Sequence, residues 1–118
     1  ETAWPAVAAE VRRGIEDFTK PGDRFAVEIP MMFEQGDRSF DGTFDRTLCV
    51  TASMEARLSR LTKKRGYSAS EAANRIASQM DPYEKAKLCT DSIDNSGCEL
   101  ELKTRLGSWI DEIERGRR

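Results

Sequence analysis

The stretch Asp91-Ser92-Ile93-Asp94-Asn95-Ser96-Gly97 sets the fold that we expect for this chain. A brief extended segment ends there in the turn residues 95–97, and a helix is predicted over residues 99–114. In parallel α/β sheets, ligands bind beyond the carboxyl ends of the strands, so the turn is a candidate binding loop. Asn95 offers both hydrogen-bond donors and acceptors, as reading a base edge requires. An ordinary turn and helix cap would use the same residues.

Two further strands are predicted on the N-terminal side of this stretch. Residues 25–29 read as a short buried strand that Pro30 ends, because proline cannot donate to a ladder. Residues 47–51 read as a second buried strand, and residues 35–45 as a polar loop between the two. Strands that alternate with helices indicate a parallel sheet with right-handed crossovers, and such strands are usually buried on both faces.

The helices are predicted from apolar spacing and from cap residues. A first helix over residues 4–18 carries an apolar stripe, and Ser53 caps a second that runs to about Lys64 and is closed by Gly66. Two more begin at a capping box, Ser68 to Glu71, and at Asp81-Pro82. The expected core faces are Val7, Val11, Ile15 and Phe18 in the first helix and Leu102, Leu106, Trp109, Ile110 and Ile113 in the last.

The second helix ends in a concentration of positive charge. Residues 57–65 hold five Lys and Arg residues, and Arg60 and Lys64 are four apart, so they share a helix face. Guanidinium groups suit phosphate oxygens, and a helix-turn-helix excursion of this kind between two strands resembles a mobile phosphate lid. A solvated charged face is the simpler interpretation of the same residues.

Composition restricts the chemistry. The 118 residues carry 19 Lys and Arg against 21 Asp and Glu, a balance that argues against nonspecific nucleic-acid binding. Histidine is absent, which excludes Ser-His-Asp and Cys-His systems within this sequence. Cys49, Cys89 and Cys98 show no zinc-site spacing, so we expect small buried residues in a reducing compartment. No apolar run reaches bilayer-spanning length, and a cytoplasmic protein without a membrane or nucleic-acid partner is expected.

Taken together, these segments resemble the dephospho-CoA kinase family over residues 25–106. The resemblance is carried, in chain order, by Ile29-Pro30-Met31-Met32-Phe33-Glu34, by Ser53, Leu58 and Arg60, by Gly66, by Arg75-Ile76-Ala77-Ser78-Gln79, by Glu84-Lys85-Ala86-Lys87 and by Asp91-Ser92-Ile93-Asp94-Asn95-Ser96-Gly97. The last of these motifs is the most specific.

The resemblance implies an α/β fold: a partial P-loop kinase-like three-layer arrangement with a short parallel sheet, flanking helices and a helical lid. One partial domain would cover residues 1–118, with the lid region at 53–80. Enzymes of the family transfer the γ-phosphoryl group of ATP, with Mg, to the ribose 3′-hydroxyl of dephospho-CoA, the last step of coenzyme A synthesis.

The resemblance also assigns roles to residues of this chain. Arg60 and Lys64 would be lid residues that face the ATP phosphates. The adenine side would be formed by Asn95, Ser96 and Gly97, and the acceptor-substrate cleft by Pro30, Met31 and Glu34. No metal ligand is implied within this sequence.

The sequence also departs from the family pattern. Lys64 stands where the family usually has Arg, Trp4-Pro5 replaces a His-Pro pair, and Thr90 replaces an Ala. No Gly-x-x-x-x-Gly-Lys-Ser/Thr loop occurs in the chain, and the family's acceptor-activating acid has no counterpart. We therefore expect the C-terminal part of a kinase that is inactive alone and has an uncovered sheet edge that favours dimerisation. The alternatives are a degenerate, non-catalytic kinase-like module and a basic lid that contacts RNA, which the acidic remainder disfavours.

Overall fold

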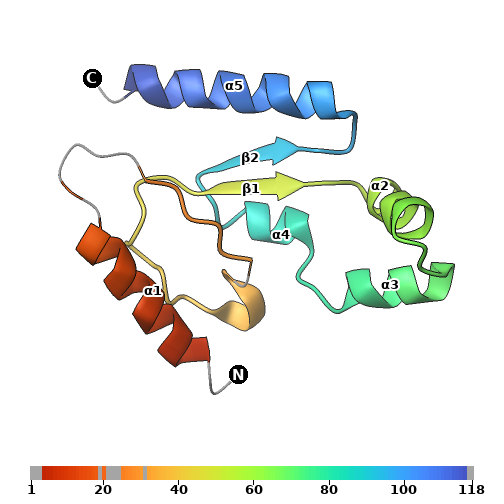
Figure 1. Ribbon diagram of the computed structural model, residues 1–118, viewed down its shortest axis with the longest axis horizontal. Coiled ribbons are helices and arrows are strands. Elements are labelled where there is room, and N and C mark those ends of the chain that lie inside the picture. Colours follow the sequence, from red (N-terminus) through yellow and green to blue (C-terminus); the bar gives the residue numbers. More distant parts are fainter. Residues whose placement is uncertain (1–3, 19, 21–24, 31, 117–118) are drawn as a thin grey trace. The chain divides into compact units, whose positions relative to one another are not determined.

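The computed structural model describes residues 4–18, 20, 25–30 and 32–116 (Figure 1). The chain divides into two compact units, Glu1–Asp45 and Arg46–Arg118. Each unit is a body of its own and is described by itself. Met31, one of the three residues expected in the acceptor cleft, lies outside the described residues.

The first unit is built on helix α1, Trp4–Phe18, and a single 3-10 turn, η1, Glu34–Gly36. Ala8 is fully buried, and Phe33 and Phe40 are almost so. Arg12 joins the helix to the following loop, because its Nη1 atom donates to the Ser39 carbonyl at 2.6 Å and its guanidinium lies 6.0 Å from the centre of the Phe40 ring. The predicted helix is confirmed.

Two predictions for the first unit are wrong. Residues 25–29 do not form a strand: their backbone lies outside any ladder, and Phe25 is exposed. An extended segment becomes a strand only when a neighbouring strand takes up its hydrogen bonds, and none of the described residues does so here. Val7 was expected in the helix core but is 47% exposed.

The second unit contains a two-stranded parallel sheet made of β1, Leu48–Thr51, and β2, Asp91–Asp94. Val50 lies opposite Ile93 in the register. The strands run in the same direction, and the segments that follow them leave from the same end of the sheet (Figure 1). The predicted parallel pairing and both strand positions are confirmed.

Burial on both faces of the strands, in contrast, is wrong for β1. Cys49 and Thr51 are buried, whereas Val50 between them is 48% exposed. Helix α4, Pro82–Ala86, packs against β1, and α5, Glu99–Gly116, packs against β2. Because α4 is the one of these two helices that packs closely against β1, side chains on one face of the strand are buried and Val50 on the other face is exposed.

A pair of threonines holds the beginning of this sheet in register. The Thr47 backbone N–H donates to the Thr90 hydroxyl at 2.8 Å, and the Thr90 backbone N–H donates to the Thr47 hydroxyl at 2.9 Å. The Thr90 hydroxyl also donates to the Thr47 carbonyl at 2.8 Å. An alanine at position 90 would keep the backbone N–H bond to the Thr47 hydroxyl but would lose the two bonds that the Thr90 hydroxyl makes.

Between the strands lie the helices of the predicted lid: α2, Met54–Ser59, a π-helical turn, η2, Arg60–Lys64, and α3, Ala69–Ala77. Ser53 caps α2, and Ser68 and Glu71 form the expected capping box of α3. Gly66 has a positive φ of 75° between them, a conformation that favours glycine. Helix and cap predictions are therefore confirmed, but the π-helical end of the second helix was not foreseen.

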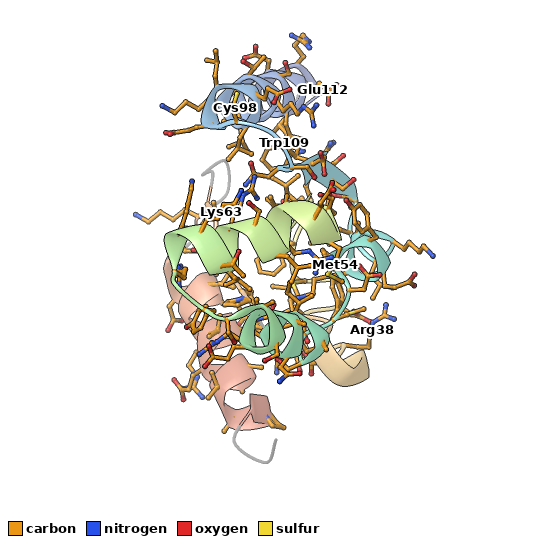
Figure 2. All side chains as sticks on the ribbon, turned by 90° about the vertical axis from the view of Figure 1, so that its right-hand side faces the viewer. Arg38, Met54, Lys63, Cys98, Trp109 and Glu112 are labelled. Carbon is orange, nitrogen blue, oxygen red and sulfur yellow. The ribbon has the colours of Figure 1, made fainter. Side chains whose placement is uncertain are left out.

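The core face of α5 is only partly as predicted. Four of its five expected residues are half-buried, namely Leu102, Leu106, Trp109 and Ile113, but Ile110 is 50% exposed. Figure 2 shows Trp109 on the side of α5 that faces the rest of the second unit. Within the described ranges, no helix combines the length and the apolar character that crossing a bilayer requires.

Candidate functional site

The turn after β2 is held by the hydroxyl of Ser96. Its Oγ atom donates to Asp94 Oδ1 at 2.8 Å and accepts the backbone N–H of Ser53 at 2.8 Å. Ser53 is the cap residue of α2, and its own hydroxyl accepts the backbone N–H of Ala56 at 3.0 Å. One serine therefore joins the loop after the second strand to the first turn of the lid.

The far end of the same helix reaches the same loop. Arg60, the first residue of the π-helical turn, donates from Nη2 to the Gly97 carbonyl oxygen at 3.1 Å. This contact unites two predicted site residues that are 37 positions apart in the sequence. Arg57, one turn earlier, donates from Nε to the Ala52 carbonyl at 2.9 Å.

Asp94 is the acid of this loop, and its carboxylate is stabilised in the charged form. The hydrogen bond from the Ser96 hydroxyl is the main reason that the pKa of Asp94 lies below its ordinary value, and the Ser96 backbone N–H and the Arg105 charge add to it against a smaller desolvation effect. Arg105 on α5 donates to the Asp94 carbonyl at 2.9 Å and lies 3.7 Å from its carboxylate. The loop is thus fixed from both α2 and α5.

Asn95 and Lys64 differ from these fixed residues. The Asn95 backbone N–H donates to the Thr51 carbonyl at 2.6 Å, and its half-buried side chain makes no hydrogen bond within the described part of the chain. Lys64 is exposed at the end of the π-helical turn, and it too lacks a hydrogen-bond or ion-pair partner among the described residues. Neither side chain is therefore held by the described part of the structure.

The π-helical turn contains a hydroxyl that bonds to the helix backbone. The Thr62 hydroxyl donates to the carbonyl of Leu58 at 2.9 Å and approaches that of Ser59 at 3.3 Å. Short π-helical turns are frequent at functional sites. In Figure 2, Met54 and Lys63 lie toward opposite ends of this continuous helical segment.

An open hollow of about 400 Å³ lies between α2, α3 and the start of α4. The residues that line it are Met54, Arg57, Ile76, Ala77, Gln79, Asp81 and Tyr83. Ile76 and Gln79 belong to the Arg75–Gln79 motif of the sequence. The sequence motif drew attention to Ile76 and Gln79. Nothing in the sequence indicated that Met54 and Tyr83, which lie outside the motif, would line the same hollow.

The expected acceptor segment belongs to the first unit. Pro30 is exposed in a turn that the Met32 backbone N–H closes onto the Ile29 carbonyl at 3.3 Å. Glu34 begins the 3-10 turn and is half-buried. Phe33 before it is buried with a positive φ of 70°, an uncommon conformation for a residue with a side chain.

Metal ligands are not assembled in the described part of the chain, where no three His, Cys, Asp or Glu side chains are grouped to hold an ion. The cations Arg60 and Lys64 suit phosphate oxygens, and the Asn95 amide suits a base edge.

The comparisons with known proteins agree on one family. The family model for dephospho-CoA kinase matches residues 1–101. A dephospho-CoA kinase of Bacillus cereus is 38% identical over 103 residues, which are 86% of this chain and 50% of that protein. Those of Sulfurimonas denitrificans and Lactobacillus johnsonii are 34% and 28% identical, over 93% and 98% of this chain and 53% and 57% of their own lengths.

The chain spans about half the length of the curated relatives that it matches. No solved structure matches it significantly. The match to the family model nevertheless covers most of the sequence and includes the turn after β2, Arg60 and Lys64. The chain belongs to the dephospho-CoA kinase family.

Proposed function

We propose that this chain is the C-terminal part of a dephospho-CoA kinase, which transfers the γ-phosphoryl group of ATP to the ribose 3′-hydroxyl of dephospho-CoA in the cytoplasm. The observation that carries the proposal is the contact between Arg60 and Gly97, because it brings the basic lid helix onto the loop at the carboxyl ends of the strands. Nucleotides bind at that end of parallel sheets. The reaction that we propose is the one for which the matched family, dephospho-CoA kinase, is named.

In this proposal, the base and the phosphates of ATP lie along one path. Asn95, Ser96 and Gly97 border the adenine, and the Asn95 amide, which has no partner in the described structure, reads its edge. Arg60 then stands at the junction of base and phosphates, since it contacts Gly97. Lys64 lies one turn further and faces the phosphates, where its charge stabilises the transferring group.

The acceptor would meet the first unit. Pro30, Met31 and Glu34 are proposed to line its cleft, with the rigid proline turn and the half-buried Glu34 as the fixed points. The phosphate-binding loop and the acceptor-activating acid have no counterpart in this sequence, and the described residues group no three side chains that could hold magnesium. We therefore propose that the isolated chain binds nucleotide weakly and is inactive, because it lacks the groups that position the phosphates.

Calorimetry of this chain with ADP tests the nucleotide site. We expect weak, saturable binding that ATP competes away and that an Arg60→Gln/Lys64→Gln variant loses. A Lys63→Gln variant is the matched control, since Lys63 is an exposed cation of the same turn. Absence of binding in the native chain, or equal binding by all variants, would contradict the proposal.

A non-catalytic kinase-like module is the alternative, favoured by Lys64 in place of the family's arginine and by the absence of the phosphate loop from this sequence. The full-length gene product distinguishes the two. Coenzyme A formation from ATP and dephospho-CoA by that protein rejects the alternative, and nucleotide binding without turnover supports it. Coenzyme A formation by the 118 residues alone would refute their proposed inactivity.

We also propose that the chain self-associates through the outer edge of β1. Among the described residues, β1 is hydrogen-bonded only to β2, and Val50 on it is exposed. Unpaired strand edges recruit further strands. Sedimentation at increasing concentration should reveal a dimer that Val50→Lys weakens, and a monomer at all concentrations would refute the proposal.

A further inference from the structure

The turn between η2 and α3 is the tip of a helical hairpin that consists of α2, η2 and α3, residues 54–77. Helix α3 contacts both α2 and η2 (Figure 2). Gly66 stands at the tip with a positive φ of 75°, and residues 63–71 are exposed except for Tyr67, which is half-buried. Glycine permits more backbone conformations than other residues, so Gly66 is the position at which the hairpin would bend most easily.

Backbone hydrogen bonds close the tip locally. The Tyr67 backbone N–H donates to the Leu61 carbonyl at 3.1 Å, after the end of the π-helical arm. On the other side, the Ser68 hydroxyl accepts the Glu71 backbone N–H at 3.1 Å, and the Glu71 carboxylate accepts the Ser68 backbone N–H at 2.9 Å. These bonds belong to the turn and to the first turn of α3, and none of them reaches the second turn of that helix.

A side-chain contact connects the tip to the second turn of α3. The guanidinium carbon of Arg75 lies 4.3 Å from the centre of the Tyr67 ring. A cation within about 6 Å of an aromatic centre is attracted by the negative face of the ring. Glu71 lies one helical turn before Arg75, which is a favourable order of charges. The pKa of Glu71 lies below its ordinary value mainly because of hydrogen bonds with Ser68, and the charge of Arg75 lowers it further.

The attraction to the ring explains why Arg75 lies against the tip. Lys63, Lys64 and Arg65 come directly before the turn with no acid among them. Like charges repel, and Arg75 is exposed, so without an attractive partner its side chain would extend into solvent. The Tyr67 ring and the neighbouring Glu71 instead hold the Arg75 guanidinium from two sides.

The buried face of α3 depends on the angle at the tip. Ala72 is fully buried and Ile76 is 9% exposed, and α3 makes its contacts with α2 and η2. Arg75 lies three residues after Ala72, so it stands beside this face on the helix surface. A bend at Gly66 would move α3 away from η2 and expose Ala72 and Ile76 to solvent.

We propose that the stack of Arg75 on Tyr67 is a clasp that locks the Gly66 turn, so that the hairpin of residues 54–77 moves as one rigid body. The clasp is a conformational device of the second unit, and it does not rest on the proposed kinase activity. It also gives the cations at the end of η2, Lys63 and Lys64, a fixed place relative to α3.

Amide hydrogen exchange of the whole chain, followed residue by residue by nuclear magnetic resonance, tests the clasp. Two amides report on it: that of residue 67, bonded to the Leu61 carbonyl, and that of Ala72, which donates to the Ser68 carbonyl at 2.9 Å. Tyr67→Leu removes the aromatic face and keeps an apolar side chain, and Arg75→Gln removes the charge at a similar helix propensity. Each change should lower the protection of both amides about threefold.

Matched variants separate the stack from its two members. Tyr67→Phe keeps the ring and should retain native protection. Arg65→Gln removes an exposed cation from the same tip and should also leave both amides unchanged. The double variant Tyr67→Leu/Arg75→Gln should lose about threefold in protection, whereas two independent effects would multiply to about ninefold. Amides of α5 should keep their native protection in every variant.

Three results would overturn the proposal. If protection falls at residue 67 but not at Ala72, the stack orders only its own turn. If the double variant shows the product of the two single effects, the side chains act independently. If the amides of α5 lose protection to the same extent, the changes destabilise the second unit in general and there is no clasp at the tip.

Discussion

The Nη2 atom of Arg60 donates a hydrogen bond to the carbonyl oxygen of Gly97 at 3.1 Å, and this bond connects the helical segment after β1 to the loop after β2. A guanidinium has five N–H donors, so Arg60 can keep this bond and still offer donors to a ligand. Lysine has the charge but not the planar fork. The contact therefore makes Arg60 a residue at which arginine and lysine should not be equivalent.

Arg60→Lys should weaken ADP binding about tenfold, which corresponds to about 1.4 kcal/mol. The reason is that one ammonium group cannot bond the Gly97 carbonyl and a ligand in the same geometry. Calorimetry measures the effect, with Lys63→Arg as the control that leaves the charge unchanged on the same turn. Binding by Arg60→Lys at native strength would show that the fork geometry is irrelevant.

Ser96→Ala should destabilise the second unit by about 1–2 kcal/mol, because it leaves the Ser53 backbone N–H and one Asp94 oxygen without their shared partner. Denaturant unfolding followed by circular dichroism gives the free energy of unfolding. Ser92→Ala is the control, since Ser92 is exposed on β2. If the two variants unfold at the same denaturant concentration, the Ser96 hydroxyl between Ser53 and Asp94 does not contribute to the free energy of unfolding.

Gly97→Ala should disturb α5 rather than the loop backbone. A β-carbon at position 97 would collide with the Glu101 carboxylate, which accepts the Cys98 backbone N–H at 3.0 Å at the helix start. The displaced carboxylate should cost about 0.5–1 kcal/mol, as the loss of a helix cap does.

A double-mutant cycle isolates this collision. Once Glu101→Ala has removed the carboxylate, the clash is gone. The double variant Gly97→Ala/Glu101→Ala should therefore have the same free energy of unfolding as Glu101→Ala alone. The free energies of unfolding of the three variants decide the matter. Strict additivity of the two single changes would mean that Gly97 is required for another reason.

Asp91→Asn should reduce the loss of stability in acid. Desolvation of Asp91 opposes ionisation, but hydrogen bonds to the carboxylate, among them that from Arg46 Nε at 3.0 Å, and the charge of Arg46 outweigh it and lower the pKa of the carboxyl below the ordinary value of 3.8. A lowered pKa in the folded state gives stability that is present above the unfolded-state pKa and is lost as the pH falls through the folded-state pKa. The native chain should therefore be more stable than Asp91→Asn above about pH 4, and this advantage should shrink as the pH falls below that value.

Unfolding at a series of acidic pH values measures this difference. Arg46→Gln should have a similar but smaller effect, because it removes the ion pair at 2.9 Å and leaves the other donors in place. If Asp91→Asn and the native chain lose stability in parallel below pH 4, the Asp91 cluster does not contribute to acid sensitivity.

The local signals in the sequence predicted most of the second unit. Ser53, Ser68 with Glu71, and Asp81 each cap the helix expected of them, because a cap depends on residues within one turn. The strand over residues 25–29 failed for the opposite reason: apolar residues predict burial, but a strand also needs a partner. The exposure of Val50 likewise depends on which helix reaches β1.

The candidate site was foreseen only in its parts. The sequence indicated a basic helix and a polar turn, but the bond between Arg60 and Gly97 joins residues 37 positions apart and follows from the parallel pairing of the strands. The π-helical turn at residues 60–64 was also not foreseen, because apolar periodicity does not distinguish it from a continued α-helix.

The parallel pairing of β1 and β2 also has a kinetic consequence. Residues 48–51 meet residues 91–94 only after the intervening lid has closed a long loop, whereas α2, α3 and α4 carry their own caps. Loop closure delays contacts between distant residues, and helices form on much shorter timescales. The lid helices should therefore appear early in refolding. Assembly of the sheet, with the Thr47–Thr90 bonds that select its register, should be the slow step that creates the carboxyl-end loop.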